Sequence, residues 1–435
     1  MFLLYLKRIA ILLTIFLPLL FVLSCSEDSP SEPNETVQTI TVSGFVKDFD
    51  GEPVSGVPVI IKGKTPVTTN ANGAFTVSGV SKPYEARVIF STDQAALVYQ
   101  GLTRTDPTLI YLGIASNYKS ATISGSVPPA IGKITRVFFN TDEMAWSAEA
   151  DQVTGSYILS VDWKGTDNSL SGTLQVLRWT QGSNGLPTQY DAYGFKQSIT
   201  VSDGGNFPNN NFAVTDLTDP PEQNISGSVV RPTSSYVLIN KVLYLFFGDA
   251  GIYLGQEWGV GLSDNFSYVV PSISAAKFGV DAEASLNATP TSRYTSYSKR
   301  GITGGSSGIT VNLKSAPQLN IPAHNGSGID TTTQFLWTMG SGGGICVLLI
   351  SPTNPAAGPT FYIFTGSNSS SIPNLAPQGL GLPSNISYAW QVAQVFPVSS
   401  INDAASPTFF QQASGSAEGG QAQSEQFMFT TKTIP

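Results

Sequence analysis

Short runs of alternating apolar and polar residues fill most of this chain, and turn-forming residues separate them. Val42–Val46 (VSGFV) alternates in this way, and Gly155–Leu159 (GSYIL) belongs to another such run. A period of two is typical of strands with one face on a core, whereas an amphipathic helix needs a period near 3.6 over about a dozen residues. No window after the N-terminal segment sustains the helical period. The pattern therefore predicts an all-β protein built from sandwiches.

One segment departs from this pattern. Residues 1–24 contain an uninterrupted apolar run, Ile9–Leu23, directly after Lys7 and Arg8. A short basic start followed by an apolar stretch is the pattern of a secretory signal peptide, and an uncleaved membrane anchor is the alternative. Residues 25–37 are polar, acidic and contain prolines, so we expect an acidic flexible tether. Later apolar runs are too short for a membrane-spanning helix of about 20 residues.

The end of the apolar run resembles a known processing motif. Phe21–Cys25 (FVLSC) places a small residue directly before a cysteine and is similar to the lipobox of bacterial lipoproteins. The resemblance implies cleavage before Cys25 and lipid attachment to its thiol, which anchors a protein to a membrane. Ser26–Asp28 (SED) resembles the acidic export signal of Bacteroidota surface lipoproteins. We therefore expect an outer-membrane lipoprotein displayed at the cell surface, with the periplasmic face as the alternative.

Residues 38–116 form the first predicted domain. The strand at Gly44–Val46 is followed by the turn Asp48–Gly51, the strand Val57–Gly63 and the turn and strand of Thr68–Val77. These elements resemble the carboxypeptidase regulatory-like domain, a small transthyretin-like sandwich. The resemblance implies an accessory module without peptidase activity and without zinc ligands of its own.

Two middle domains are predicted at residues 117–218 and 222–316, and the second of them is related to the first. Thr122–Val127 (TISGSV) recurs as Asn224–Val229 (NISGSV), 102 residues later. A repeat of this length suits successive domains better than a solenoid. Asp219–Glu222 (DPPE) is the predicted linker, because paired prolines stiffen a chain and cannot extend a strand ladder.

Residues 317–435 form the last predicted domain. Thr333–Thr338 is a predicted strand with Trp337 facing inward, Ser387–Val392 contains Tyr-x-Trp-x-Val, and Phe427–Thr431 (FMFTT) lies near the C-terminus. This segment resembles a fibronectin type III domain, which implies a two-sheet sandwich with Trp337 buried and Tyr388 in a structural role. The predicted fold is therefore all-β, a string of Ig-like and transthyretin-like β-sandwich domains.

Composition excludes several functional classes. The 435 residues include 22 Lys and Arg against 30 Asp and Glu, a formal charge of −8. Cleavage before Cys25 removes Lys7 and Arg8, which leaves 20 basic and 30 acidic residues, or −10. A nucleic-acid partner is therefore not expected, because such binding needs clustered basic residues. One His and two Cys are too few for a zinc or haem enzyme or a disulfide scaffold.

We expect no catalytic residue, metal or cofactor. The only imidazole, His324, lies in a predicted surface turn, and Cys346 lies in an apolar strand where a buried, inert thiol is expected. Asp142 and Glu143 are adjacent, and neighbouring residues on a strand point to opposite faces, so they make a poor catalytic pair. The sequence therefore predicts a protein that is not an enzyme.

Aromatic residues of the second domain give the best signal for a binding site. Trp179, Tyr190 and Tyr193 lie close together in the sequence, near Asp and Asn residues. Flat aromatic rings beside polar groups can hold sugars, so these three are the predicted ligand-binding residues. The alternative is that they cover the edge of the sandwich. Trp146 and Trp258 are weaker candidates of the same kind.

The predicted export and lipidation signals, together with the domain architecture, indicate a non-catalytic, lipid-anchored cell-envelope protein that acts in adhesion or in binding a glycan or another ligand. Its expected partners are the membrane, through the lipid on Cys25, and a glycan or an extracellular protein. Two alternatives remain open. One is an accessory carbohydrate-binding lipoprotein of an outer-membrane uptake system, and the other is a structural spacer without a ligand.

Overall fold

The computed structural model describes residues 39–48, 51–112, 118–165, 167–286, 292–409 and 418–433. The predicted signal peptide, Cys25 and the tether lie outside these residues. Contacts divide the chain into Met1–Gln38 and Thr39–Pro435, and all the described residues belong to the second unit. Within the described residues, no helix is long and apolar enough to cross a membrane.

The first module consists of two small sheets. A three-stranded sheet has the order β4-β1-β7, and the strands β3, β2, β5 and β6 are paired in that order. The strands are β1 (Thr39–Lys47), β2 (Pro58–Ile61), β3 (Val67–Thr68), β4 (Ala74–Ser81), β5 (Tyr84–Phe90), β6 (Ala95–Leu102) and β7 (Thr108–Ile110). Strand β1 is antiparallel to β4 and parallel to β7.

The second and third modules repeat this strand order. Their three-stranded sheets are β11-β8-β14 and β18-β15-β21, and their four-stranded arrays are β10-β9-β12-β13 and β17-β16-β19-β20. The second module contains β8 (Lys119–Ser126), β9 (Ile134–Asn140), β10 (Ala145–Glu149), β11 (Ser156–Trp163), β12 (Ser169–Gln181), β13 (Pro187–Ser202), β14 (Asn206–Phe207) and the 3₁₀ helix η1 (Val214–Asp216). The third contains β15 (Glu222–Val230), β16 (Val237–Phe247), β17 (Ala250–Trp258), β18 (Asn265–Pro271), β19 (Lys277–Ser285), β20 (Tyr294–Ile302) and β21 (Ile309–Asn312). The repeated motifs at Thr122 and Asn224 lie in β8 and β15, which hold the same central place in their sheets.

The fourth module has a different order. Strands β22, β24 and β27 form one sheet, and β29, β28, β25 and β26 are paired in that order, with β30 pairing to both β28 and β23. The elements are β22 (Gln318–Ile321), β23 (Gly326–Ile329), β24 (Gln334–Thr338), β25 (Ile345–Pro352), η2 (Pro355–Ala357), β26 (Thr360–Thr365), β27 (Ser369–Ser371), η3 (Ala376–Gln378), β28 (Ser387–Phe396), α1 (Ile401–Ala404), β29 (Gly419–Gln423) and β30 (Phe427–Thr431).

Alternation explains these strands. In β11 every second residue is buried, from Tyr157 through Leu159 and Val161 to Trp163. The intervening residues are exposed, so one face of the strand packs on a core and the other meets water. Trp337 and Tyr388 of the fourth module are likewise buried, as the sequence predicts. The all-β prediction is confirmed.

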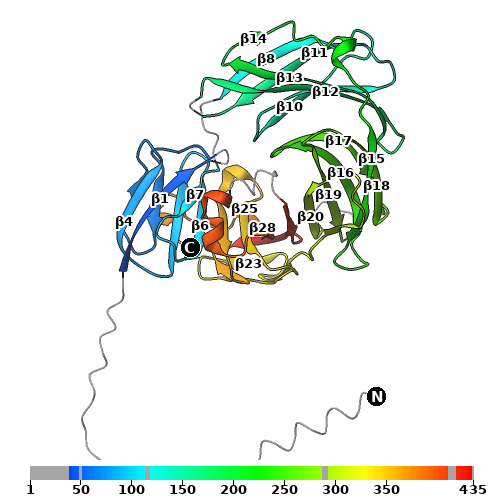
Figure 1. Ribbon diagram of the computed structural model, residues 1–435. Coiled ribbons are helices and arrows are strands. Elements are labelled where there is room, and N and C mark those ends of the chain that lie inside the picture. The colour runs from blue at the N-terminus through cyan, green and yellow to red at the C-terminus, as the bar shows by residue number, and fades with distance from the viewer. Residues whose placement is uncertain are drawn as a thin grey trace, which may run out of the picture. The chain divides into compact units, whose positions relative to one another are not determined.

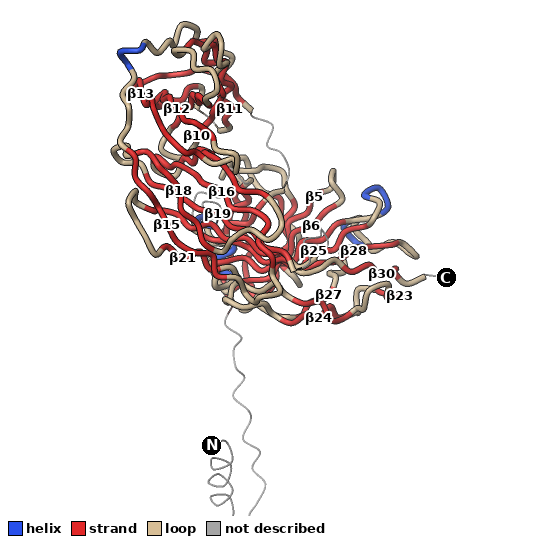
Figure 2. The backbone as a smooth tube through the Cα atoms, turned by 90° about the vertical axis from the view of Figure 1, so that its right-hand side faces the viewer, coloured by secondary structure: helices blue, strands red, loops and turns tan. Residues whose placement is uncertain are grey.

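The modules are joined through their strands as well as through the chain. Strand β26 pairs in parallel with β6 of the first module, and β29 pairs antiparallel with β20 of the third. One sheet therefore runs from β17 through β16, β19, β20, β29, β28, β25, β26, β6, β5 and β2 to β3. Figure 1 colours the contributing segments by residue number, and Figure 2 shows β5, β6, β25 and β28 in one run of strands.

Strand β6 has no polar face. All five residues of Ala95–Tyr99 are buried. Leu97 and Tyr99 belong to the core of the first module, whereas Ala96 and Val98 belong to the core of the fourth. Because successive residues point to opposite faces of a strand, the small sheets of the first and fourth modules cover opposite faces of the shared sheet.

The second and third modules share one hydrophobic core. Phe138 and Trp179 of the second module belong to the same buried cluster as Leu254 of the third. The predicted linker between the modules is held in place as well. The backbone N–H of Tyr190 donates to Oε1 of Glu222 at 2.7 Å. Side-chain packing and hydrogen bonds therefore fix this joint.

Candidate functional site

Two of the predicted ligand-binding residues are buried. Trp179 is 2% exposed and Tyr190 is 1% exposed, and their ring centroids lie 6.4 Å apart within the core shared by the second and third modules. A sugar ring needs an open aromatic face for stacking. The burial of Trp179 and Tyr190 therefore argues against that role, and the third module is what covers them.

Tyr193, the third predicted residue, is half-buried and already has partners. Its hydroxyl donates to Oε1 of Gln175 at 2.7 Å, and its backbone exchanges two hydrogen bonds with Thr218. Burial raises the pKa of Tyr193 to about 12, so the ring carries a neutral hydroxyl at physiological pH. Tyr193 supports the joint between β13 and the segment that follows η1.

The residues considered for catalysis lie in ordinary surroundings. His324 is exposed, and its Nδ1 accepts from the backbone N–H of Met428 at 3.1 Å. Cys346 is buried, as its apolar neighbours predict, and burial raises the pKa of its thiol to about 11. Within the part of the chain that the structure describes, no group of three or more His, Cys, Asp or Glu could hold a metal ion.

The shared sheet has one face that neither the third nor the fourth module uses for its core. Thr295, Ala422, Gln394 and Cys346 follow one another across β20, β29, β28 and β25 in register, and all four are buried. Directly paired residues share a face, so the small sheets of both modules cover this same side. The opposite side of the shared sheet, from β17 to β29, is the open face.

A row of polar residues crosses the open face in register. Neighbouring residues of the row are paired directly across adjacent strands, so all five side chains leave the sheet on the same side. The row runs across β17, β16, β19, β20 and β29 as Trp258, Asn240, Glu283, Ser296 and Gln421. These five residues are called the Trp258 row.

Trp258 presents an accessible ring at one end of this row. It is 70% exposed and is the only exposed tryptophan among the six of the chain. The loop after it is tied to β16 by its backbone. The N–H of Gly259 donates to the carbonyl of Ile239 at 3.1 Å, and that of Gly261 to Leu238 at 3.0 Å. The ring is therefore displayed from a held loop.

A buried ion pair lies behind this loop. Nζ of Lys241 lies 2.6 Å from Oε2 of Glu257, the residue before Trp258. The same Nζ donates to the carbonyls of Ser263 and Asn265, at 3.0 and 3.1 Å, on the far side of the loop. The hydroxyl of Tyr268 also donates to Oε2 of Glu257 at 3.1 Å. Both ends of the loop are thus attached to one charged group in the interior.

Asn240 has a free acceptor next to Trp258. Its side chain is 6% exposed, and Nδ2 donates to Oε2 of Glu283 at 3.3 Å. Among the described residues, Oδ1 of Asn240 has no hydrogen-bond partner. Buried polar atoms in native proteins usually have a partner, so this acceptor calls for a donor. A ligand hydroxyl over the Trp258 row would supply one.

A second group of aromatic rings and guanidinium groups lies on the open face farther along the strands. Arg300 forms an ion pair with Asp281, and its guanidinium lies 5.2 Å from the Tyr244 ring centroid and 4.8 Å from that of Phe246. Gly279 makes this arrangement possible, because a Cβ there would lie 2.6 Å from Nη1 of Arg300. The positive charge is therefore neutralised and stacked within the protein.

The second module contributes one more cation to this region. The guanidinium of Arg136 lies 5.5 Å from the ring centroid of Tyr253 and 5.9 Å from that of Trp179, and Nη1 donates to the carbonyl of Tyr253 at 3.2 Å. Glu149 lies 3.9 Å from Arg136. Because these charges are compensated, the open face offers rings and neutral hydrogen-bonding groups more than net charge.

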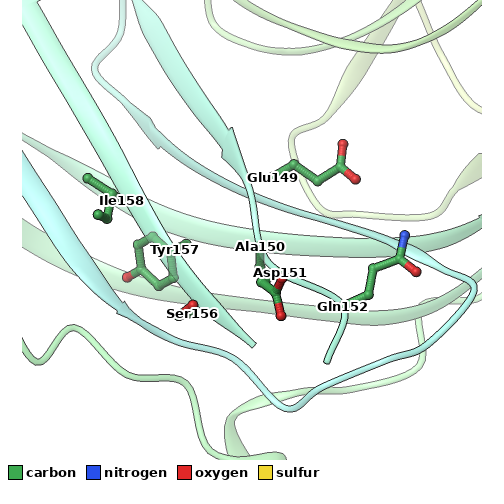
Figure 3. Close-up of a pocket in the computed structure, with 7 residues that line it drawn as sticks. All are labelled: Glu149, Ala150, Asp151, Gln152, Ser156, Tyr157 and Ile158. Atoms are coloured by element: carbon green, nitrogen blue, oxygen red, sulfur yellow. The ribbon is translucent and has the colours of Figure 1, made fainter. Parts of the chain in front are cut away.

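A pocket in the second module is a weaker candidate. It has a volume of about 600 Å³ and is lined by Glu149–Gln152 and Ser156–Ile158, at the connection from β10 to β11 (Figure 3). The carboxylate of Asp151 already accepts from the N–H groups of Val153 and Thr154 at 3.0 and 2.7 Å. These bonds lower the pKa of Asp151 and engage its Oδ1 in the turn. One of the few polar groups of this pocket therefore already has a structural role.

The fold thus defines an all-β protein of several sandwich modules with a polar, aromatic open face. No protein-family model matches the chain, and no curated protein matches it. Among solved structures it is similar to the TIE protein of Bacillus anthracis, with 8% identity and a TM-score of 0.16 over 63% of this chain and 50% of that one. The match therefore spans half the length of the TIE protein.

Two pilins are similar at the same distant level. The shaft pilin SpaA of Lactobacillus rhamnosus GG, solved as a point mutant, has 11% identity and a TM-score of 0.14 over 40% of this chain and 99% of that one. BcpA, the major pilin subunit of Bacillus cereus, has 11% identity and a TM-score of 0.15 over 63% and 99%. Similarities at this level of sequence identity and TM-score support no statement about function.

Proposed function

We propose that this chain is a non-catalytic, lipid-anchored binding protein of the bacterial outer membrane, displayed on the cell surface. The open face is the observation that carries the binding role, because the small sheets of the third and fourth modules lie on the other side of the shared sheet and polar and aromatic side chains line this one. The anchor rests on Cys25 and the residues before it. The proposed ligand is a glycan or an extracellular protein.

The modules have different parts in this proposal. The first is a carboxypeptidase regulatory-like accessory sandwich, and the fourth is fibronectin type III-like. Pairing of β6 with β26 and of β20 with β29 makes these two modules a support for the third, which bears most of the open face.

Absence of catalysis is part of the proposal and has a physical basis. Asp281 is held by Arg300, and Glu283 accepts from Asn240, so both carboxylates of the open face have structural partners. The raised pKa of Cys346 keeps it a thiol, and a thiol is a weak nucleophile. Glycans and extracellular matrix proteins incubated with the protein are expected to stay uncleaved.

Anchoring and display are tested on intact cells. Protease added outside is expected to degrade the native protein, and Cys25→Ala is expected to move the protein from the membrane to the soluble fraction. A cytosolic protein measured in parallel reports whether cells stay intact. Full protection of the native protein in intact cells, with degradation after lysis, would show that surface display is wrong.

The binding role is tested with the mature chain on an array of glycans and extracellular matrix proteins. A specific signal on either class supports a binding protein. A glycan signal favours capture for uptake or adhesion to glycans, and a matrix-protein signal favours adhesion. No signal on either class, from protein shown to be folded, would favour the spacer alternative over the proposal.

A further inference from the structure

We infer that the Trp258 row is a saccharide-binding site, with the Trp258 ring as its stacking platform. The inference rests on the proposed binding function and assigns it a place and a ligand class. The expected ligand is a neutral oligosaccharide that lies across the strands, from Trp258 on β17 toward Gln421 on β29.

The platform has the properties that sugar stacking needs. A pyranose ring has an apolar C–H face and a rim of hydroxyl groups, so it suits a flat ring that is open to water and bordered by hydrogen-bonding groups. Trp258 is 70% exposed, and its loop is held by Lys241 and by the backbone of β16. Because the backbone around Trp258 is already held, little backbone entropy is lost when a ligand binds.

Polar partners stand beside the platform in the right order. Asn240 pairs directly with Trp258 and has a free acceptor at Oδ1, and Glu283 comes next with a carboxylate that accepts from Asn240. A saccharide hydroxyl can donate to the half-buried carboxylate of Glu283, and rotation of the Asn240 amide would bring its buried Oδ1 to a second hydroxyl. Ser296 and Gln421 continue the row with groups that donate and accept.

Charge and length favour this ligand over others. The guanidinium groups of the open face, Arg300 and Arg136, are paired and stacked. Lys277 is exposed and donates to Oγ1 of Thr303, but it lies six residues before Glu283 on β19, roughly 20 Å along the strand, so no free positive charge of the described residues borders the Trp258 row. Four strand spacings separate β17 from β29, which is roughly 19 Å. The row is therefore long enough for several sugar units, and affinity is expected to rise from a disaccharide to a tetrasaccharide.

The test uses the mature chain and a panel of neutral oligosaccharides of glucose, galactose, mannose and xylose, from disaccharide to hexasaccharide. Titration calorimetry measures affinity, and acrylamide quenching of tryptophan fluorescence locates the site. The other five tryptophans are buried or half-buried, so a stacked sugar is expected to protect the one that acrylamide reaches most easily.

Variants at Trp258 separate stacking from simple apolar contact. Trp258→Ala and Trp258→Leu are each expected to raise Kd about tenfold or more, equivalent to about 1.4 kcal/mol. Trp258→Phe keeps a flat ring and is expected to lose less. Equal affinities of the Leu and Phe variants would contradict stacking.

The far end of the row has its own variant and control. Gln421→Ala is expected to weaken tetrasaccharide binding about fivefold, the loss of about one hydrogen bond, and to leave disaccharide binding unchanged. Ile131→Ala, at an 80% exposed residue of the second module, is the surface control and is expected to change nothing.

The outcomes distinguish this inference from the proposed function. Oligosaccharide binding that is unaffected by Trp258→Ala would place the site elsewhere and overturn the inference. No oligosaccharide binding, together with binding to a protein on the array, would overturn the inference and leave the proposed function standing. Cleavage of the bound oligosaccharide would overturn the non-catalytic part of the proposal.

Discussion

Two four-stranded arrays with the same strand order have opposite environments in this molecule. The array β10-β9-β12-β13 carries Trp179 on a face that the third module covers, whereas the array β17-β16-β19-β20 keeps Trp258 exposed. Both faces are rich in aromatic residues. Aromatic content therefore indicates that a face has a partner, and the packing of neighbouring modules decides whether that partner is the protein itself.

Close backbone approach decides which face is covered. The turn between β12 and β13 lies against β17, where a Cβ on Gly255 would be 2.5 Å from the carbonyl oxygen of Gly185. A Cβ on Gly185 would lie 2.6 Å from the carbonyl oxygen of Gln256. These two glycines let the second module pack on the edge of the third, and this contact accompanies the burial of Trp179.

Trp179→Ala has the largest expected effect of the changes that test this comparison. Removal of a fully buried tryptophan leaves a cavity, and the free energy of unfolding is expected to fall by about 3–5 kcal/mol. Urea denaturation followed by circular dichroism measures the loss. A change below about 1 kcal/mol would mean that the ring is not buried between the modules in solution.

Glu257→Ala is expected to lower the free energy of unfolding by about 3 kcal/mol. The change leaves the buried ammonium of Lys241 without its counter-charge, and an uncompensated buried charge is costly. Because Glu257 and Lys241 also hold the Trp258 loop, acrylamide quenching at Trp258 is expected to increase. Lys241→Met combined with Glu257→Leu removes both charges and is expected to restore much of the stability, which a purely steric effect of the alanine would not allow.

Gly255→Val tests the joint between the two modules directly. The new side chain collides with the backbone of the β12–β13 turn, and overpacking of this kind costs about 1–3 kcal/mol. Separation of the modules is expected to increase the exposure of Trp179, measured as a red shift of tryptophan emission. Gly366→Val, at a glycine with open space around it and, like Gly255, without a positive φ, is the matched control that lacks the collision. Emission that is identical in the two variants would contradict this role of Gly255.

Trp258→Ala has the smallest expected effect on stability. Exposed side chains away from special features contribute within about 0.5 kcal/mol, so the free energy of unfolding is expected to be unchanged while saccharide binding weakens about tenfold or more. The two alanine variants are thus expected to differ in the free energy of unfolding because Trp179 is buried and Trp258 is exposed. A loss of more than about 2 kcal/mol would show that Trp258 packs against the protein.

Much of the fold follows from local pattern. The alternation at Gly155–Leu159 predicts a strand with one buried face, which is β11, and the recurrence of TISGSV as NISGSV predicts two strands in equivalent places, which are β8 and β15. The tryptophan-containing strands of the last module, β24 and β28, are found where the apolar pattern predicts them. These features depend on residues near one another in the sequence.

The joints between modules and the open face depend on distant residues. Ala95–Tyr99 lacks alternation because two different modules pack on its two faces, and no local pattern identifies the second of them. The Trp258 row is assembled from five strands that span residues 240 to 421, so its polar residues look unrelated along the chain. In the sequence, only the polar residues next to Trp258 point to a binding site at this row. They are a weaker indication than the aromatic cluster that includes Trp179.

The pairing of β6 with β26 has a consequence for how the chain reaches its native state. Val98 and Ile363, which face each other in this pair, are 265 residues apart (363 − 98). Contacts of such high sequence separation form slowly, and an unpaired strand edge is a template for aggregation. The first module therefore has an unpaired apolar edge until β26 has been synthesised, so a chain that ends before Thr360 is expected to aggregate through its N-terminal module.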